Sequence, residues 1–267
     1  MDIDLFSLRS LLFLPASNPR AIAKARHAGA DLVILDLEDA VKPDDKDTAR
    51  AAAIEACDTA WSMPVAIRIN GVGRQWHAED IVAAAKSKAD VIVVPDVRAA
   101  EDLDNIRSEV GRPVIAMVES AQGVLAAPAI GCRASALMIG TNDLANDLHL
   151  PRSSGRAAMQ VALQTVILAA RAAQIPALDG VFNRLDDEDG FAAECAEGKT
   201  LGFDGKSLIH PHQIAICHRE YAPSVDDLAH AERLIAAATG GAERFEGAMV
   251  ERMHVEAARR LIARAKL

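Results

Sequence analysis

Aromatic residues are scarce in this chain of 267 residues, at 3% of the sequence, so aliphatic side chains and alanine must fill the core. An excess of basic residues is also lacking, because the formal net charge is −9 and the pI about 5.4. That balance argues against nucleic acid as a partner, although one or two local cations suffice for a small anionic ligand. No apolar run approaches the ~20 residues of a membrane span, and the acidic start Met1–Asp4 does not resemble a signal peptide.

Cysteine is rare as well, and its spacing forms no motif. The four thiols, Cys57, Cys132, Cys195 and Cys217, make no C-x-x-C pair and suit neither a zinc site nor a disulfide framework. We therefore expect buried free thiols in a reducing compartment, which predicts a cytoplasmic protein.

What the sequence does contain is a series of eight short runs rich in Val, Ile and Leu, each followed by a helical pattern. The expected strands are Ser10–Pro15, Asp31–Leu37, Pro64–Asn70, Asp90–Pro95, Pro113–Glu119, Ala136–Ile139, Ala177–Phe182 and a short one at Gly205–Ile209. Strands that alternate with helices at this spacing favour parallel pairing with right-handed crossovers. Eight such units predict a closed (β/α)8 TIM barrel rather than an open doubly wound sheet.

The pattern changes after Pro223, where two helical segments follow without an intervening strand. The predicted helices are Ser224–Ala238 and Met249–Ala265, with a hinge at Gly240-Gly241. We therefore divide the chain into a catalytic barrel over residues 1–222 and a C-terminal helical extension over residues 223–267. The extension either caps the barrel, covers one of its faces, or packs on a neighbouring subunit.

Acidic residues end several of the expected strands, where barrel enzymes carry their chemistry. Glu119 and Asp143 follow neighbouring strands, which lie ~4.8 Å apart, so the two carboxylates can share one ion. Carboxylates without a histidine pair suit Mg²⁺ better than zinc or copper. The alternative is that each carboxylate caps the helix that follows it.

A second acidic group and an arginine lie at other strand ends. Asp36 and Glu38 point to the same side if their strand continues, because side chains alternate with a period of two. The alternative for these acids is helix capping and a salt link to Lys42 or Lys46. Arg68 lies inside an apolar strand, where a guanidinium is seldom buried without a partner. Its planar fork suits a substrate carboxylate, and an internal salt bridge to Glu38 or Glu119 is the alternative, which does not exclude ligand contact.

Two further groups are candidates for binding. Arg20 and Lys24 lie one helical turn apart near an expected helix N-terminus, which makes either a phosphate site or a solvated helix face. His210 and Pro211 follow the eighth strand, where a lone histidine is most often a capping or surface group.

Seven segments in this order resemble the citrate lyase β-subunit-like (CitE-like) family of the HpcH/HpaI aldolase/citrate lyase superfamily, related to malyl-CoA and citramalyl-CoA lyases. The matching segments are Arg9–Pro15, Asn18–Arg20, Leu35–Val41, Arg68–Asn70, Val118–Gly123, Gly140–Leu144 and Gly202–Pro211. They span nearly the whole chain, and their joint occurrence is specific although none suffices alone.

The resemblance implies a barrel of the phosphoenolpyruvate/pyruvate type with Mg²⁺ on Glu119 and Asp143. It implies that Arg68 grips a carboxylate and that Glu38 shapes the pocket. The same resemblance places Arg20 and Lys24 at the phosphates of coenzyme A, with His210 and Pro211 beside the thioester arm. It also implies a homotrimer or hexamer, in which the C-terminal helices reach a neighbour's site.

One departure from the family pattern concerns the acid/base residue. The family's tail commonly reads D-G-x-M-I-D, whose last Asp serves the neighbouring subunit, whereas this chain reads Glu246 to Glu251 as E-G-A-M-V-E. Glu251 keeps the carboxylic acid but lengthens it by one methylene, and small displacements change rates strongly. A milder change is Ala16-Ser17, where the family often has glycine.

These observations predict a Mg²⁺-dependent lyase that cleaves or forms a 3-hydroxy-3-carboxy acyl thioester, such as citryl-, malyl- or citramalyl-CoA, giving a 2-oxo acid and an acyl thioester. Two alternatives remain at this stage. One is a metal-dependent aldolase on free hydroxy-oxo acids, which needs no coenzyme A site. The other is a catalytically impaired binding subunit of a lyase complex, which works with an acyl-carrier protein.

Overall fold

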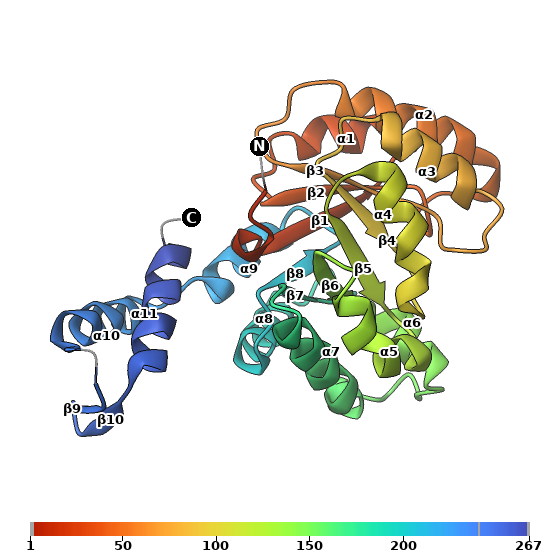
Figure 1. Ribbon diagram of the computed structural model, residues 1–267. Helices are drawn as coiled ribbons and strands as arrows, with labels where there is room; N and C mark the ends of the chain where they lie inside the picture. Colours follow the sequence, from red (N-terminus) through yellow and green to blue (C-terminus); the bar gives the residue numbers. More distant parts are fainter. Residues whose placement is uncertain (1–2, 240, 266–267) are drawn as a thin grey trace. The chain divides into compact units, whose positions relative to one another are not determined.

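The chain folds into a closed barrel of eight parallel strands in sequence order, from β1 to β8 (Figure 1). The computed structural model describes residues 3–239 and 241–265. The strands are β1 (Ser10–Pro15), β2 (Leu32–Asp36), β3 (Val65–Arg68), β4 (Val91–Val94), β5 (Val114–Val118), β6 (Ala136–Ile139), β7 (Ala177–Asp179) and β8 (Gly205–Leu208). The predicted (β/α)8 barrel is confirmed, and its short eighth strand ends one residue before Ile209.

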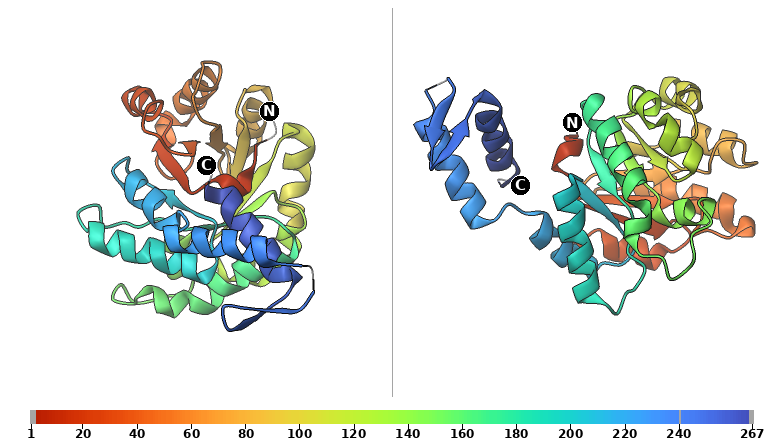
Figure 2. Two further views of the ribbon diagram at one scale, coloured as in Figure 1. Left: turned by 90° about the vertical axis from the view of Figure 1, so that its left-hand side faces the viewer. Right: turned by 90° about the horizontal axis from the view of Figure 1, so that it is seen from below.

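Helices follow the strands and surround the barrel (Figure 2). They are α1 (Pro19–Ala25), α2 (Lys46–Cys57), α3 (His77–Lys86), α4 (Asp104–Val110), α5 (Ala121–Gly131), α6 (Thr141–Asp147), α7 (Gln160–Ala172), α8 (Glu188–Leu201) and α9 (Gln213–Tyr221). Short 3-10 turns precede α2, α4 and α7, at Pro43–Asp45, Ala100–Leu103 and Arg156–Met159, and another at Leu5–Ser7 precedes β1. The helix α6 was not predicted from the sequence, and it places Asp143 in its first turn.

The interior of the barrel is filled by alternate residues of each strand, as a period of two requires. Its buried cluster contains Leu11, Leu32, Ile34, Ala66, Val91, Val93, Ile115, Met117, Ala136, Met138 and Leu178, with Phe13 packed against it. These side chains are aliphatic or sulfur-containing apart from Phe13, as the low aromatic content required. Continuing the alternation toward the carboxyl ends of the strands leads from Ile34 to Asp36 and from Ala66 to Arg68. The polar site is therefore the next layer above an apolar core.

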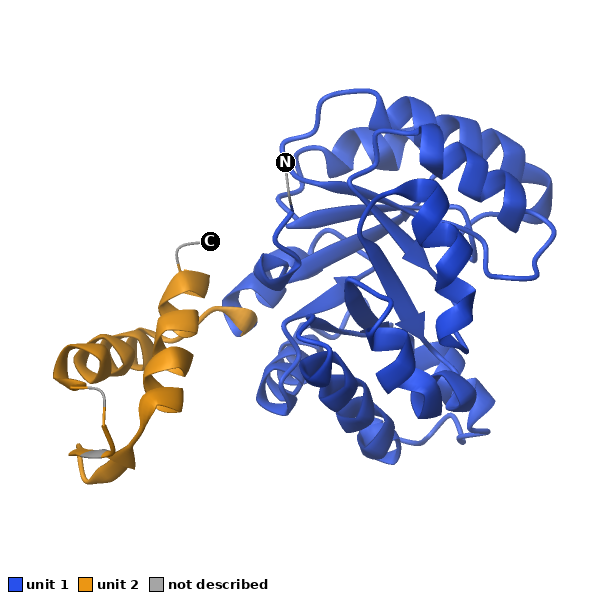
Figure 3. Ribbon diagram, in the orientation of Figure 1, with its two compact units in different colours: residues 1–220 blue, residues 221–267 orange. Residues whose placement is uncertain are grey.

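The chain divides into two compact units, residues 1–220 and 221–267 (Figure 3). In the second unit, α10 (Val225–Ala237) and α11 (Arg252–Ala265) pack around a small apolar cluster that includes Leu234, Val250 and Ala258. The predicted hinge at Gly240-Gly241 is partly outside the described residues, because residue 240 is not described.

A β-hairpin between these helices corrects the sequence analysis, which expected no strand and a helix beginning at Met249. The strands β9 (Glu243–Phe245) and β10 (Ala248–Val250) pair antiparallel. They are joined by Glu246 and Gly247, whose φ angles are +48° and +88°. Positive φ at both central residues is the condition for a type I′ hairpin turn. Because of this hairpin, the second helix begins at Arg252 and not at Met249.

Within the described residues, no helix combines the length and apolar character needed to cross a membrane. Three of the four cysteines are buried free thiols, as expected, but Cys132 is exposed. It lies at the C-terminal cap of α5, after the last turn that packs on the barrel.

Candidate active site at the barrel mouth

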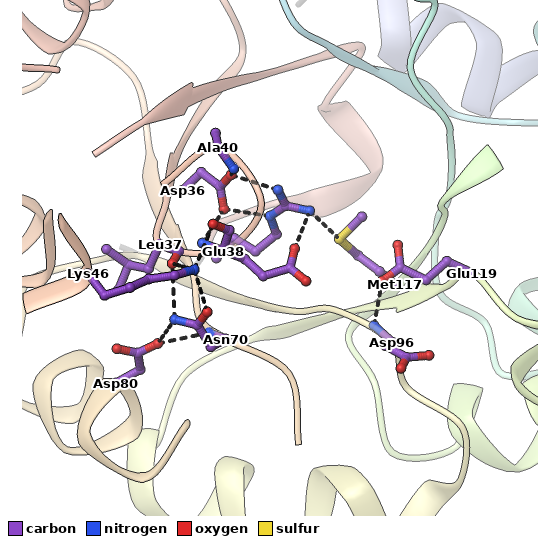
Figure 4. A network of polar contacts seen from close by, with 11 residues as sticks. Asp36, Leu37, Glu38, Ala40, Lys46, Asn70, Asp80, Asp96, Met117 and Glu119 are labelled. Carbon is purple, nitrogen blue, oxygen red and sulfur yellow. Dashed lines mark hydrogen bonds and ion pairs between the residues drawn. The ribbon is translucent and has the colours of Figure 1, made fainter. Parts of the chain in front are cut away.

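The centre of the site is an ion pair between the last residue of β2 and the last residue of β3. Asp36 and Arg68 are register partners in these neighbouring strands. The guanidinium donates from Nε to Asp36 Oδ1 and from Nη2 to Asp36 Oδ2, both at 2.7 Å (Figure 4). Asp36 also accepts the backbone N–H groups of Glu38 and Ala40, at 2.9 and 3.0 Å. Asp36 therefore orients the arginine and shapes the following turn, and its oxygens are taken by these contacts.

Glu38 is the second acid that contacts the arginine. Its Oε2 lies 2.8 Å from Arg68 Nη1, which confirms that the side chains of positions 36 and 38 lie on one side. Burial raises the pKa of Glu38 to about 7; Arg68 opposes this shift, and the charges of Asp39 and Asp36 add to it. The predicted salt bridge between Arg68 and Glu38 is thus present. The guanidinium also lies 4.9 Å from the ring centre of Phe13, an arrangement that favours a cation.

Glu119 follows β5 and is buried, with 6% of its surface exposed. Its Oε1 accepts the backbone N–H of Asp96 at 2.6 Å. The N-cap of α5 is Ser120, whose hydroxyl accepts the Gly123 N–H, so the capping alternative does not hold for Glu119. Burial raises the pKa of Glu119 to about 8, and the negative charges of Glu38 and Asp143 raise it further.

Asp143 lies in the first turn of α6, after the N-cap residue Gly140, so it is not a capping residue either. Burial raises its pKa, and the nearby charge of Asp39 adds to the shift. Glu119 and Asp143 both line one cavity and destabilise each other's charge. A cation between them would remove that repulsion.

The donor set of this cavity fits a hard cation such as Mg²⁺. Its lining contains carboxylates and the amide side chains of Asn142 and Asn183, without a thiol or imidazole. No group of three acidic, histidine or cysteine side chains converges anywhere in the described part of the chain. Mg²⁺ commonly takes one or two carboxylates and completes its shell with water and substrate oxygens, so two protein ligands suffice.

The cavity has a volume of about 370 Å³ and opens at the carboxyl ends of the strands. Arg68 and the acids form its polar side, and Phe13, Met117, Ile139, Val181 and Ile209 form an apolar side. Asn142 and Asn183 hydrogen-bond to each other across the rim, from α6 to the segment after β7. A small molecule with carboxylate or hydroxyl oxygens and an apolar portion matches this lining once a cation offsets the excess of carboxylates over the one arginine.

Four predicted binding residues are not in the cavity lining. Arg20 and Lys24 are exposed on α1, whose N-terminus is capped by the Asn18 side chain. His210 and Pro211 are exposed after β8, where the cavity lining reaches Ile209. The amide side chain of Gln213 accepts the N–H groups of Ile209 and His210 and so fixes this segment. Their predicted contact with coenzyme A stays a prediction.

Sequence reasoning missed a buried polar layer behind the site. Lys46, at the start of α2, donates to the carbonyl oxygens of Leu37 and Glu38 and to Asn70 Oδ1. Asn70 in turn donates from its side chain to Leu37 O and to Asp80 on α3 (Figure 4). The only signal in the sequence was a lysine at a helix start, and its burial is not visible without the tertiary structure.

Glu251 lies in the C-terminal unit, directly before α11. Its backbone N–H donates to His254 Nδ1 at 3.0 Å, and its carbonyl accepts the His254 N–H at 2.9 Å. The side chain is half-buried within that unit. The role of Glu251 as the acid/base residue of a neighbouring subunit stays a prediction.

The comparisons with known proteins agree on one family. A model of the HpcH/HpaI aldolase/citrate lyase family matches residues 9–211. A (3S)-malyl-CoA thioesterase of Cereibacter sphaeroides is 40% identical over 270 residues, covering 97% of this chain and 94% of the relative. The citrate lyase subunit beta of Leuconostoc mesenteroides subsp. cremoris is 37% identical over 278 residues, covering 95% and 92%.

Solved structures give the same result. The CitE protein of Mycobacterium tuberculosis, in complex with magnesium, acetoacetate and coenzyme A, matches with a TM-score of 0.86 at 33% identity, over 98% of this chain and 100% of that chain. The citrate lyase beta subunit of the same organism, complexed with oxaloacetate and magnesium, matches with a TM-score of 0.74 at 32% identity, over 83% and 100%.

Proposed function

This chain belongs to the HpcH/HpaI aldolase/citrate lyase family, and we propose that its barrel mouth is the site where a carbon–carbon bond of an acyl thioester is cleaved or formed. The enzyme is a carbon–carbon lyase that uses Mg²⁺ and acts on coenzyme A thioesters. The observation that carries the proposal is the cavity that Arg68 and the acids Glu119 and Asp143 line together, close enough for the charges of Arg68 and Asp143 to act on Glu119. The substrate class is a 3-hydroxy-3-carboxy acyl thioester, which yields a 2-oxo acid and an acyl thioester.

The residues of the cavity, and Glu38 beside it, have distinct tasks in this reaction. Glu38 contacts the cavity residue Arg68 but is not itself in the cavity lining. Glu119 and Asp143 would hold Mg²⁺, which supplies Lewis acidity toward a substrate carboxylate and its hydroxyl or oxo oxygen when bound. Arg68 binds the substrate carboxylate, and its fixed orientation comes from the two-point contact with Asp36. Glu38 exchanges a proton near neutral pH, because its pKa is about 7. That value suits a group that holds the proton of the hydroxyl as the C–C bond breaks.

The parts of the substrate outside the cavity are assigned by the family pattern. We place the phosphates of coenzyme A against Arg20 and Lys24 at the N-terminal turn of α1, and the thioester arm beside His210 and Pro211. The exposure of these residues, on segments that directly follow β1 and β8, supports the assignment. The electron pair released from the C–C bond forms the enolate of the acyl thioester, and Glu251 supplies the proton that neutralises it.

Glu251 serves a neighbouring chain in this proposal, so the working form is a homotrimer or hexamer. The C-terminal unit supports this, because it folds as a separate compact unit with a small apolar cluster of its own. The free thiols agree with a cytoplasmic setting. A carrier protein remains an alternative bearer of the thioester.

The direct test supplies the purified protein and Mg²⁺ with citryl-, malyl- and citramalyl-CoA and measures the released 2-oxo acid. We expect turnover of at least one of them. In Glu119→Ala we expect the turnover rate to fall by more than ~100-fold, since that substitution removes a proposed metal ligand.

Calorimetry with free coenzyme A separates this function from an aldolase on free hydroxy-oxo acids. Binding that weakens in Arg20→Ala supports the thioester lyase, and no binding would favour the aldolase.

A second candidate is hydrolysis of the thioester bond, favoured by the relative at 40% identity that is a (3S)-malyl-CoA thioesterase. Hydrolysis of malyl-CoA leaves malate and free coenzyme A, whereas C–C cleavage leaves glyoxylate and acetyl-CoA. Following all four products from one reaction distinguishes the two activities. Malate without glyoxylate would identify this chain as a hydrolase.

A further inference from the structure

We propose that Lys46 is a positioning residue: its ammonium group clamps the turn Leu37–Val41 and thereby sets the place of Glu38 beside Arg68. This inference rests on the proposed function for its catalytic consequence. The clamp itself is a statement about the turn and has a test of its own.

The geometry of Lys46 is unusual for a lysine. Only 6% of the residue is exposed, and its Nζ donates to Leu37 O at 2.7 Å, Glu38 O at 2.8 Å and Asn70 Oδ1 at 2.7 Å. An ammonium group has three N–H donors, so all of them are used. Each acceptor is a neutral oxygen, and two of the three are consecutive backbone carbonyls of the turn that carries Glu38.

Hydrogen bonds hold the backbone of this turn from two sides. Asp36 fixes its N–H groups through Glu38 and Ala40, and Lys46 fixes its carbonyl side. The Glu38 carbonyl also accepts the Val41 N–H at 3.0 Å. Because the N–H groups and the carbonyls of the turn are both hydrogen-bonded, the backbone of Glu38 has a fixed position. Its side-chain carboxylate lies 2.8 Å from Arg68 Nη1.

The clamp is anchored in the helices behind the strands. Asn70 donates to Leu37 O at 3.0 Å and to Asp80 Oδ2 at 2.6 Å. Asp80 is 1% exposed and also pairs with Arg50 of α2 at 2.7 Å. Lys46 and Arg50 of α2 and Asp80 of α3 thus form one buried polar layer with Asn70. Figure 4 shows the contacts of Lys46, Asn70 and Asp80 in this layer. Without Lys46, Leu37 O keeps only the Asn70 amide as a donor, Glu38 O keeps only the Val41 N–H, and Asn70 Oδ1 loses its ammonium donor. The turn is then held by fewer contacts, which favours its rearrangement.

The first test measures hydrogen exchange of the amides in segment 36–41 without any substrate. In Lys46→Met, which keeps an unbranched apolar stem, we expect exchange in this segment to rise at least ~10-fold, while the strands keep their protection. Lys42→Met is the matched control, because Lys42 is an exposed lysine directly after this segment, and we expect the exchange of segment 36–41 in this variant to match wild type. Unchanged exchange in Lys46→Met would overturn the clamp.

Lys46→Arg separates hydrogen-bond geometry from charge. Arginine keeps the cation but has a planar fork, which cannot direct three donors from one atom at these converging oxygens. We expect exchange of segment 36–41 to rise in this variant as well. Exchange and turnover equal to wild type would show that the charge alone matters, and the proposal would be wrong.

A double-mutant cycle tests the coupling to catalysis. If Lys46 acts through Glu38, then Lys46→Met and Glu38→Gln each lower kcat by ~10- to 100-fold, and the double variant stays within about threefold of Glu38→Gln. Multiplied losses would show that Lys46 supports the enzyme by a separate structural route. If wild-type protein turns over no thioester, the proposed function fails, and the exchange measurement still decides the clamp.

Trp76 provides a spectroscopic signal from the same layer. The Lys46 Nζ lies 4.9 Å from the centre of the Trp76 ring, and the chain has two tryptophans. In a Trp61→Phe background, Trp76 is the remaining one, and its emission should shift in Lys46→Met and stay constant in Lys42→Met. The same emission spectrum in all three proteins would contradict the placement of the ammonium group.

Discussion

At the residue scale, the site depends on how acids share one guanidinium. Arg68 uses Nε and Nη2 for Asp36 and Nη1 for Glu38. Burial lowers the pKa of Arg68, but the charge and hydrogen bonds of Asp36 together with the charges of Glu38 and Glu119 outweigh it and raise this pKa well above the usual range. The arginine is therefore always charged and has its orientation fixed before substrate binds. Such preorganisation lowers the cost of gripping a carboxylate.

Arg68→Lys tests whether the fork matters as well as the charge. A lysine cannot reproduce the two-point contact with Asp36 and also reach a substrate carboxylate. We expect kcat/KM for the thioester to fall by ~100-fold or more, with the fold retained by circular dichroism. The control is Arg98→Lys, an exposed arginine paired with Asp96 outside the cavity lining, which should stay near wild type.

The acids of the site also predict a pH dependence. Burial raises the pKa of Glu119 from 4.5 to about 8. A carboxyl group whose folded pKa is raised contributes stability below its unfolded pKa, and this contribution is lost as the pH rises to about 8. Protons and Mg²⁺ compete for the same oxygens. Between pH 5 and 8.5 the metal-free protein should therefore lose thermal stability, while Mg²⁺ binds and stabilises it increasingly.

Thermal unfolding at several pH values, with and without Mg²⁺, measures this. Glu119→Gln should flatten the metal-free pH dependence and remove most of the Mg²⁺ effect. A metal-free melting temperature that climbs through this pH range in wild type would contradict the raised pKa.

At the scale of elements, the carboxyl ends of the strands decide which side chains meet. The alternation that places Ile115 and Met117 inside the barrel brings Glu119 to the mouth. On the adjacent strand, the inward position after Met138 is Gly140. A Cβ there would lie 2.2 Å from Glu119 Oε2, so the absence of a side chain gives the carboxylate its space.

Gly140→Ala should consequently displace Glu119. We expect Mg²⁺ affinity, measured by calorimetry, to fall by at least ~10-fold, and stability to drop by about 1–3 kcal/mol from overpacking. Gly155→Ala is the matched control, since a Cβ at that position meets nothing within 4 Å. Equal Mg²⁺ affinity in the two variants would show that Gly140 has no part in positioning Glu119.

Two elements show the limits of periodicity in a single sequence. The helix α6 was missed because Thr141–Asp147 has only Leu144 and Ala145 as apolar residues, too few for a helical repeat. The β9–β10 hairpin was read as the start of a helix because Met249 precedes a true amphipathic helix. Its turn depends on positive φ at Glu246 and Gly247, and glutamate rarely adopts that conformation.

At the scale of the whole molecule, the proposal joins two compact units of different chains into one working site. Light scattering should give a mass of three or six times 28.4 kDa. A monomer with full activity would show that Glu251 does not act on a neighbouring chain.

Complementation tests the same idea by activity. Glu119→Gln and Glu251→Ala should each be nearly inactive, because one lacks a proposed metal ligand and the other the proposed acid. When the two variants are co-expressed at equal amounts, roughly a quarter of the sites combine an intact Glu119 with an intact Glu251 from another chain, and activity should recover to that level. No recovery would indicate that both residues act within one chain.

Glu251→Asp restores the family's residue and tests whether the longer glutamate side chain places the acid correctly. A large gain in turnover in this variant would show that the native enzyme is impaired.

The barrel, the acidic mouth and the family are predictable from the sequence alone. Strand and helix periods are local properties, and the motifs at the strand ends can be recognised without knowing how the elements pack. The sequence also indicates that Arg68 forms either an internal salt bridge or a contact with a ligand, but it does not say which acid the arginine pairs with. Only the tertiary structure decided that Asp36 takes the arginine fork, that Lys46 is buried under the Glu38 turn, and that Arg20 and His210 lie outside the cavity lining. The physical reason is that a side chain's partner depends on the register between strands and on the placement of the helices behind them, and neither is encoded in the spacing of any single segment.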